Sequence, residues 1–367
     1  MSTRIDLPES WRFPSTRYRG SKRKLLPWIW HKLTPLAPSF DTVLDLFGGT
    51  GVVSLLFKAM GKQVTFNDYL RFNHQAGVAF VSNARTKISE EDMDLVLSFD
   101  KSGFEDGFIT RTFQGFYFTD EENQWLDRVL SNVGRLSRKY NGSELDEKRA
   151  LILWSVFQSC LIKRPFNLFH RRNLNLRTND VPRKFGNHTT WQKPFPTAFR
   201  QFASEANSVV FDNQRENSAH CIDAFAFPSS DFDLVYLDPP YFFPGIRDSD
   251  YLEAYHFLEG LANYERWGSL IDLDTYNRRL KRGAVGAWPS RSYPELSDRF
   301  ESLIDRYRRS MIVISHKSGS LVPVGDIAKS LERAGKIVRT HYRSYTYALS
   351  KLNGRPRKNI EWLLVAL

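Results

Sequence analysis

The sequence has few cysteines and no long apolar stretch. Its 367 residues include only two cysteines, Cys160 and Cys221, which lie far apart and form no CxxC pair. This spacing argues against a disulfide framework and a cysteine zinc site, so we expect no bound metal and a reducing, cytoplasmic setting. No run of about 18 apolar residues occurs and the first residues hold no apolar segment, so we expect neither a membrane span nor a secretory signal.

The sequence also lacks an excess of acidic residues. Lys and Arg number 52 against 41 Asp and Glu, which gives a net charge of +11, while apolar residues make up 41% and can form a sizeable core. A basic balance favours polyanionic partners such as nucleic acid, because each neutralised phosphate releases counterions. Many soluble proteins are simply basic, so charge alone leaves the partner open. The length predicts one large domain with an embedded subdomain.

The spacing of apolar segments and turns predicts an α/β fold. Strands are expected at 42–47, 63–66, 232–237, 311–315 and 362–365. Helical stripes interrupt this alternation in the middle of the chain, where Thr119 and Glu122 form a capping-box pattern and Ser143 is expected to cap a helix over 147–162. We therefore predict a doubly wound, Rossmann-like sheet built from 1–83 and 208–367, with a mainly helical insertion at 84–207.

A glycine turn follows the first expected strand. Residues Asp45 to Gly51 spell DLFGGTG, and such a turn lets the backbone approach a ligand closely. Asp68 lies at the end of the next strand, where an acid can accept hydrogen bonds from ribose hydroxyls. The glycines lack the GxGxxG spacing, which favours a mononucleoside such as S-adenosylmethionine over a dinucleotide. A purely structural turn, with Asp68 as a helix cap, is the alternative.

The sequence Asp238-Pro239-Pro240-Tyr241 follows the strand expected at 232–237. The two prolines end the strand and fix φ, so they hold an acid and an aromatic ring rigidly in place. This arrangement suits an exocyclic amine, which is a poor nucleophile because its lone pair is delocalised into the ring. A carboxylate and a backbone carbonyl can accept hydrogen bonds from its N–H groups and stabilise the charge that develops. An aromatic ring can stack on the base.

These motifs together resemble a known family. Arg17 to Lys22 (RYRGSK), Phe47 to Gly51 (FGGTG), Asn67-Asp68-Tyr69, Asp238 to Tyr241 (DPPY) and Glu361 to Leu364 (EWLL) occur in the order of the alpha-type DNA adenine-N6 methyltransferases, whose cofactor motifs precede the catalytic motif. The resemblance covers almost the whole chain. It implies a site-specific enzyme that transfers a methyl group from S-adenosylmethionine to N6 of a flipped adenine. The family's target-recognition domain would correspond to the insertion.

The resemblance also implies roles for single residues. The catalytic set would be Asp238, Pro239, Pro240 and Tyr241, with Tyr241 stacking on the extruded base. Lys22 would reach the methionine carboxylate of the cofactor, Tyr18 would pack near the sulfonium, and Asp68 would bind the ribose. Asp223 would contact the cofactor's adenine amine. The remaining residues expected to line the cofactor site are Gly20, Asp45, Phe47, Gly49 and Gly51. The family often has two glycines before this lysine, whereas Gly20-Ser21 stand here.

A basic segment in the insertion is expected to contact DNA. The segment from Lys163 to Lys184 is rich in arginine and asparagine, which suit guanine and adenine in the major groove. The predicted DNA-binding residues are Lys163, Arg164, Asn167, His170, Arg171, Arg172 and Arg177. Phosphate contact without base readout, or a solvated basic loop, is the alternative.

Three further groups have two interpretations each. The stretch Arg339–Lys358 contains basic residues and tyrosines but no acid. It is interpreted either as a hairpin that contacts phosphate or as a hairpin that is simply exposed. The basic cluster at 278–282 is similarly ambiguous. Tyr251, Tyr255 and His256 occur at helical spacing after the catalytic loop, and either line a target pocket or pack in the core; core packing is favoured.

Other function classes fit less well. Cytosine-N4 methyltransferases more often carry serine where Asp238 stands, while some RNA methyltransferases share DPPY, so RNA stays the alternative substrate to double-stranded DNA. A non-catalytic DNA-binding protein on the same fold would be expected to lose Asp238, the glycines or Lys22. A bacterial, archaeal or phage origin follows by resemblance alone. The sequence leaves open the recognition site, the oligomeric state and whether a cognate restriction endonuclease accompanies the protein.

Overall fold

The structure is a computed structural model. It describes residues 13–99, 107–164, 167–170, 174–179, 188–228, 230–244, 250–281, 283, 292–352 and 355–367. Within this part of the chain, no helix is long and apolar enough to cross a membrane.

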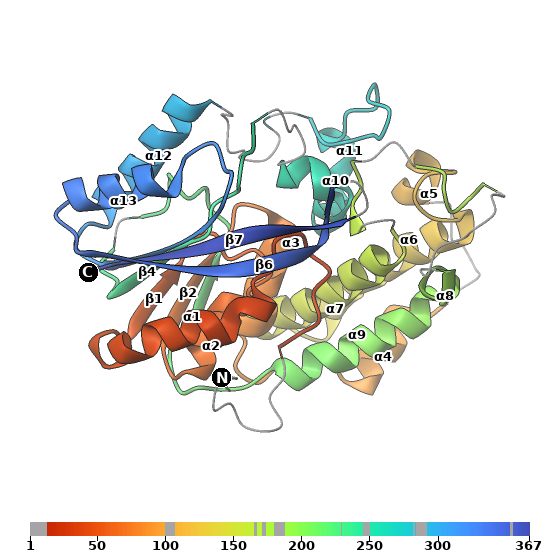
Figure 1. The fold of residues 1–367 in the computed structure, drawn as a ribbon. Helices are drawn as coiled ribbons and strands as arrows, with labels where there is room; N and C mark the ends of the chain where they lie inside the picture. Colours follow the sequence, from red (N-terminus) through yellow and green to blue (C-terminus); the bar gives the residue numbers. More distant parts are fainter. Residues whose placement is uncertain are drawn as a thin grey trace.

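A mostly parallel sheet forms the centre of the molecule (Figure 1). Its strands are β1 (Thr42–Asp45), β2 (Gln63–Asn67), β3 (Ser218–His220), β4 (Leu234–Leu237), β5 (Met311–Lys317), β6 (Val338–Leu352) and β7 (Arg355–Ala366). They lie in the order β3-β2-β1-β4-β5-β7-β6. The first five are parallel, and β7 runs antiparallel to both β5 and β6. The predicted Rossmann-like methyltransferase sheet is therefore confirmed.

Helices cover both faces of this sheet. Alternate side chains of a strand point to opposite faces, so Val43 packs with α1 (Leu26–Leu33) and α2 (Val52–Ala59), whereas Leu44 packs with α12 (Tyr293–Arg306) and α13 (Val324–Arg333). Figure 1 shows the two helix pairs on opposite sides of the strands. Because both faces are covered, apolar side chains dominate the buried middle of the inner strands, and polar ones stand mainly near the strand ends.

The helical part of the chain runs between β2 and β3. Its helices are α4 (Glu90–Leu97), α5 (Phe108–Thr112), α6 (Asp120–Arg135), α7 (Gly142–Ile162), α8 (His188–Gln192) and α9 (Phe195–Val209). Thr119 and Glu122 form the predicted capping box at the start of α6. The predicted cap at Ser143 is wrong, because α7 begins earlier and Asn141 is its N-cap.

The core of this helical part extends beyond the predicted insertion. The same buried cluster includes side chains of α3 (Arg71–Ala76), α10 (Tyr251–Ala262) and α11 (Trp267–Leu270). A π-helix at Gly77–Ser82 continues α3. Short 3₁₀ helices lie at Arg23–Leu25, Thr34–Ser39, Leu136–Arg138 and Tyr264–Arg266. The boundaries 84–207 thus stay a prediction, and the helices on either side of them share its packing.

The basic stretch near the carboxyl end forms a long hairpin. Strands β6 and β7 pair from Val338 with Ala366 outward, with an irregularity between Thr346 and Lys351. In Figure 1 this hairpin runs past the sheet toward the side of α10 and α11. The predicted hairpin is confirmed, whereas its contact with phosphate stays a prediction.

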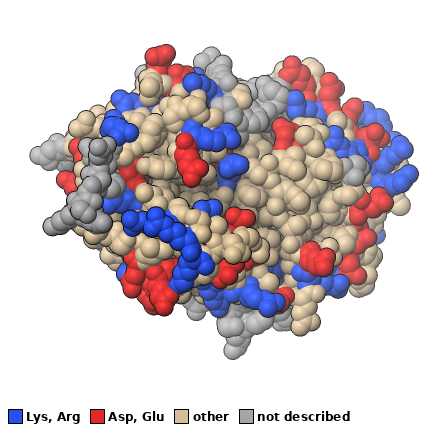
Figure 2. Space-filling model, turned by 180° about the vertical axis from the view of Figure 1, so that it is seen from behind, with Lys and Arg blue, Asp and Glu red and all other residues tan. Residues whose placement is uncertain are grey.

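Figure 2 shows the molecule from behind the view of Figure 1. On this face, Lys and Arg alternate with Asp and Glu around a broad area of uncharged residues.

Candidate active site

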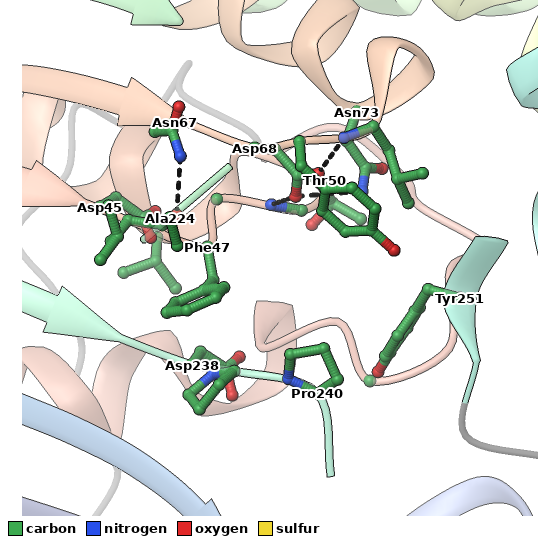
Figure 3. Close-up of a pocket in the computed structure, with 18 of the residues that line it drawn as sticks. Asp45, Phe47, Thr50, Asn67, Asp68, Asn73, Ala224, Asp238, Pro240 and Tyr251 are labelled. Carbon is green, nitrogen blue, oxygen red and sulfur yellow. Dashed lines mark hydrogen bonds between the residues drawn. The ribbon is translucent and has the colours of Figure 1, made fainter. Parts of the chain in front are cut away.

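A pocket opens at the carboxyl ends of β1, β2 and β4. The strand order reverses between β1 and β4, and in such sheets the ligand crevice lies at this point. The empty space of the pocket, with the open solvent at its mouth included, is about 910 Å³. It is lined by these predicted residues: Tyr18, Gly20, Lys22, Asp45, Phe47, Gly49, Asp68, Asp223, Asp238, Pro239, Pro240 and Tyr241. Figure 3 shows residues from all three strand ends around one hollow.

The glycine turn after β1 has a backbone that other residues rarely adopt. Gly49 and Gly51 have φ values of 52° and 73°, and the Gly51 N–H donates to the Gly48 carbonyl at 2.8 Å. A Cβ on Gly48 would lie 2.1 Å from the Phe66 ring. Gly51 is not among the pocket-lining residues and instead forms the N-cap of α2. Its role is therefore to shape the turn, while Gly49 lies at the pocket.

Asp68, at the end of β2, is held by several donors. Its carboxylate accepts hydrogen bonds from the Gly49 N–H at 2.9 Å, the Leu70 N–H at 2.9 Å and the Asn73 side chain at 3.1 Å. Burial raises the pKa of this acid to about 6. Asn67 joins neighbouring strand ends, because its side-chain amide donates to the carbonyls of Leu46 and Ile222. The pocket wall is therefore rigid where Asp68 faces it.

Asp45, at the end of β1, has one satisfied oxygen and one unsatisfied oxygen. Its Oδ2 accepts a 2.6 Å hydrogen bond from Ser54, whereas its buried Oδ1 has no hydrogen-bond partner within the described structure. Burial raises the pKa of Asp45 to about 7, and the charges of Asp238 and Asp68 act in the same direction. Buried polar atoms are rarely left unpaired, so this oxygen suits a hydrogen-bond donor or cation on a ligand.

A stack of aromatic rings forms another wall. The Tyr18 ring lies 4.7 Å from that of Tyr255 and 5.4 Å from that of Tyr251, with interplanar angles of 13° and 14°. Tyr251 lines the pocket and stands beside Pro240 in Figure 3. Tyr255 and His256 are fully buried in the core. The favoured core interpretation therefore holds for Tyr255 and His256, whereas Tyr251 lies at the pocket.

The catalytic loop after β4 meets a cluster of charges. Lys22 Nζ lies 3.1 Å from Asp238 Oδ1, 2.6 Å from Glu361 Oε1 and 2.6 Å from the Tyr241 hydroxyl. The Tyr241 hydroxyl also donates to Asp238 Oδ1. Burial raises the pKa of Asp238 and the Glu361 charge adds to this rise, while Lys22 opposes it. Lys22 thus pairs with two protein carboxylates, while its contact with the methionine carboxylate of the cofactor stays a prediction.

Asp223 lies in the segment between β3 and β4. Its Oδ1 accepts a 2.8 Å hydrogen bond from the Phe225 N–H, and the residue lines the pocket beside Ala224. This location matches the predicted contact with the cofactor's adenine, but that contact itself stays a prediction.

Part of the predicted DNA-binding segment is turned inward. Lys163, Arg164 and Arg177 have exposed fractions of only 1%, 1% and 8%. Lys163 and Arg177 both pair with Glu122, while the Arg164 guanidinium lies 4.6 Å from the Tyr117 ring centre. Two of these charges are paired inside the protein and all three side chains are buried, so we correct the prediction for these residues and assign them a structural role.

The other predicted DNA-binding residues have a different outcome. Asn167 and His170 are partly exposed, and Asn167 has a φ of 59°. Arg171 and Arg172 lie outside the described residues. For these four residues DNA contact stays a prediction.

Several residues at the site had no role assigned from the sequence. Glu361 lies beneath Lys22, and Asn73 holds both Asp68 and the Tyr18 hydroxyl. An acid in the apolar strand IEWLLV could have pointed to Glu361, because glutamate is rarely fully buried without a partner. Nothing in the sequence around Asn73 distinguishes it from an ordinary helix residue.

Comparisons with known proteins agree with this geometry. M2.HphI, a type II methyltransferase of Haemophilus parahaemolyticus, is 28% identical over 236 residues, which cover 63% of this chain and 66% of that protein. M.NlaIII, a type II methyltransferase of Neisseria lactamica, is 24% identical over 342 residues, or 89% of this chain and 92% of the relative. Modification methylase LlaI of Lactococcus lactis subsp. lactis is 25% identical over 375 residues, which cover 93% of this chain.

The chain spans different shares of these relatives. It covers about two thirds of the Haemophilus protein and 53% of the Lactococcus protein. A protein-family model extends from Tyr18 through the glycine turn and the catalytic loop to α11, matching residues 18–269. This match confirms the resemblance noted in the sequence: the chain belongs to the D12 class N6 adenine-specific DNA methyltransferases.

Proposed function

We propose that this chain transfers a methyl group from S-adenosylmethionine to N6 of adenine at a specific site in double-stranded DNA. The observation that carries the proposal is the position of Asp238. It follows β4 at the same pocket that receives Asp45 from β1 and Asp68 from β2. Family membership supports the reaction, and the pocket's acids and aromatic rings support the cofactor.

The pocket residues fit S-adenosylmethionine, which would supply the methyl group attached to a positively charged sulfur. Asp68 would accept hydrogen bonds from the ribose hydroxyls. The unpaired Oδ1 of Asp45 suits the ammonium group of the methionine portion. Tyr18, at the centre of the aromatic stack, would present a ring near the sulfonium. Asp223 and Phe47 would face the remaining part of the nucleoside.

Asp238 and its neighbours would act on the target amine. The Asp238 carboxylate and the Pro239 carbonyl would accept the two N6 hydrogens, which favours an available nitrogen lone pair and stabilises the developing charge. Pro239 and Pro240 hold these acceptors in a fixed position, so little rearrangement is needed during the reaction. The target base must leave the duplex, at a cost of about a few kcal/mol of unstacking.

Before the base arrives, the Tyr241 hydroxyl donates a hydrogen bond to Asp238 Oδ1. We infer that Tyr241 releases this oxygen when adenine enters, and that its ring then stacks on the base. Asn167, His170, Arg171 and Arg172 are proposed to contact the DNA around the site. The names of the relatives support a role in restriction–modification, in a cytoplasmic setting; a paired endonuclease is left open.

One assay tests the proposal. Purified protein is incubated with tritiated S-adenosylmethionine and either mixed-sequence duplex DNA or structured RNA, and the modified nucleoside is identified by mass spectrometry. We expect N6-methyladenine in the DNA alone. Label in RNA alone, or on cytosine, would overturn the substrate. A lack of label in either nucleic acid, across a DNA library containing all short sites, would overturn the enzymatic function.

A further inference from the structure

Glu361 is an acid buried inside an apolar strand. It lies on β7, between Ile360 and Trp362, and its side chain has an exposed fraction of 0%. It also lies outside residues 18–269, the part matched by the family model. A buried carboxylate is costly unless it is paired and hydrogen-bonded, so its partners indicate why it is tolerated.

The partners of Glu361 all belong to the active site or lie directly beside it. Its Oε1 lies 2.6 Å from Lys22 Nζ, accepts a 3.0 Å hydrogen bond from Ser315 on β5, and lies 3.3 Å from the Tyr241 hydroxyl. Glu361 therefore connects the closing strand to the amino-terminal motif and to the catalytic loop.

The cluster contains two carboxylates and one ammonium. The Lys22 ammonium is closer to Glu361, at 2.6 Å, than to Asp238, at 3.1 Å. If Asp238 held this ammonium alone, the cation would occupy the lone pairs that the target amine needs and would weaken the carboxylate as an acceptor. Glu361 draws the ammonium away while keeping it near enough to stabilise the ionised Asp238.

We propose that Glu361 is a positioning residue for methyl transfer, which shares the Lys22 ammonium with Asp238 and so keeps the Asp238 carboxylate free to accept a hydrogen from the target amine. This inference rests on the proposed function. It gives a residue of β7 a role in the methyl transfer that takes place at the end of β4.

The charges around Asp238 set the direction in which its pKa should move when Glu361 is changed. Burial raises the pKa of Asp238, the negative charge of Glu361 raises it further, and Lys22 and the Tyr241 hydroxyl lower it. Loss of the Glu361 charge should therefore lower the pKa of Asp238. The other titratable groups that interact with this cluster, from β1, β4, β5 and α10, are Asp45, Tyr236, His316 and Tyr251. They stay unchanged in the variants below.

The test is Glu361→Gln, which keeps the shape and removes the charge. We expect kcat to fall by about tenfold or more, while the KM values for cofactor and DNA stay within about twofold. The acid limb of the kcat–pH profile should move to lower pH, because Asp238 then loses a repelling charge. An acid limb that stays in place would overturn the proposal, since loss of folded structure alone does not move it.

Two further variants complete the test. The acid limb should move in the opposite direction in one of them and should not move in the other. Ser315→Ala removes a donor from Glu361, so Glu361 should hold Lys22 more strongly and the acid limb should move to higher pH; this variant keeps the test decisive if Glu361→Gln fails to fold. Glu122→Gln is the matched control, because it removes a carboxylate from another cluster with two cations. It should lower stability and leave the acid limb in place. Shifts of the same sign in both site variants would contradict the proposal.

A measurement without turnover separates this inference from the proposed function. Carboxyl-¹³C NMR of aspartate in the cofactor-free protein, assigned with Asp238→Asn, follows the titration of Asp238 directly. We expect its midpoint to be lower in Glu361→Gln than in the wild type. An unchanged midpoint in an active enzyme overturns the inference alone. Absence of methylation by the wild-type protein overturns the proposed function.

Discussion

The pocket at the ends of β1, β2 and β4 and the segment from Lys163 to Arg177 are both rich in charged side chains, but the charges have different surroundings. In the pocket, Asp45 has a buried oxygen without a hydrogen-bond partner, and Asp238 faces the cavity. In the segment, Lys163 and Arg177 both pair with Glu122 inside the helical core. Residue type and spacing therefore predicted which side chains meet at one pocket where the sheet edge fixes the direction of the side chains, and failed where helix packing decides it.

The largest expected effect tests the pocket side of this comparison. Asp238→Ala should lower kcat by at least about 100-fold, because it removes a preorganised acceptor for the target amine. Cofactor affinity, measured by calorimetry, should stay within about threefold of the wild type, since other residues hold the cofactor. Turnover within about tenfold of the wild type would contradict the role assigned to Asp238.

The next prediction tests the structural role assigned to the buried arginine and lysine side chains of the basic segment. Arg177→Ala removes hydrogen bonds to the charged Glu122 but leaves Glu122 paired with Lys163, so the free energy of unfolding should fall by about 1.5–3 kcal/mol. The salt dependence of DNA binding should not change. Urea denaturation and DNA titrations at several salt concentrations measure the two quantities. Unchanged stability together with a shallower salt dependence would restore Arg177 as a DNA contact.

A smaller effect separates binding from stability at Asp45. The pKa of Asp45 is about 7 in the folded protein and 3.8 ordinarily, so between these pH values the folded protein keeps a proton that the unfolded chain releases. The folded state therefore loses stability as pH rises through this range. Asp45→Asn should raise the free energy of unfolding by about 1–3 kcal/mol at pH 8 and change it little at pH 4. Cofactor affinity should fall by about tenfold. A stability change of equal size at both pH values would contradict this explanation.

The smallest effect concerns Arg171 and Arg172, which lie outside the described residues. Replacing Arg171 and Arg172 with Gln should weaken DNA binding and reduce its salt slope by about two. Because the proposed role of the two arginines is contact with DNA and not with the protein, the free energy of unfolding should stay within about 0.5 kcal/mol of the wild type. An unchanged slope would move the DNA interface elsewhere, for which the β6–β7 hairpin is the natural next target.

Local sequence predicted much of the fold and the pocket. The strands before Gly48 and before Pro239 were found because apolar runs end at residues that stop a strand. The pairs Lys22–Glu361 and Lys163–Glu122 were not, because each joins residues far apart in the chain and forms only after the sheet and helices pack. The start of α7 was misplaced because Asn141 and Ser143 are both ordinary N-cap residues, which sequence alone does not tell apart.

The helical part leaves the sheet after β2 and returns in β3, its parallel neighbour, where Asn67 stands opposite His220. The two strands pair directly although the whole helical part lies between them in the sequence. Any replacement for α4 to α9 would have to keep an apolar surface against α3 and α10, because Tyr18 and Tyr251 of the pocket wall pack against the same core. This shared core is the constraint that a chimeric enzyme joined at β2 and β3 has to satisfy.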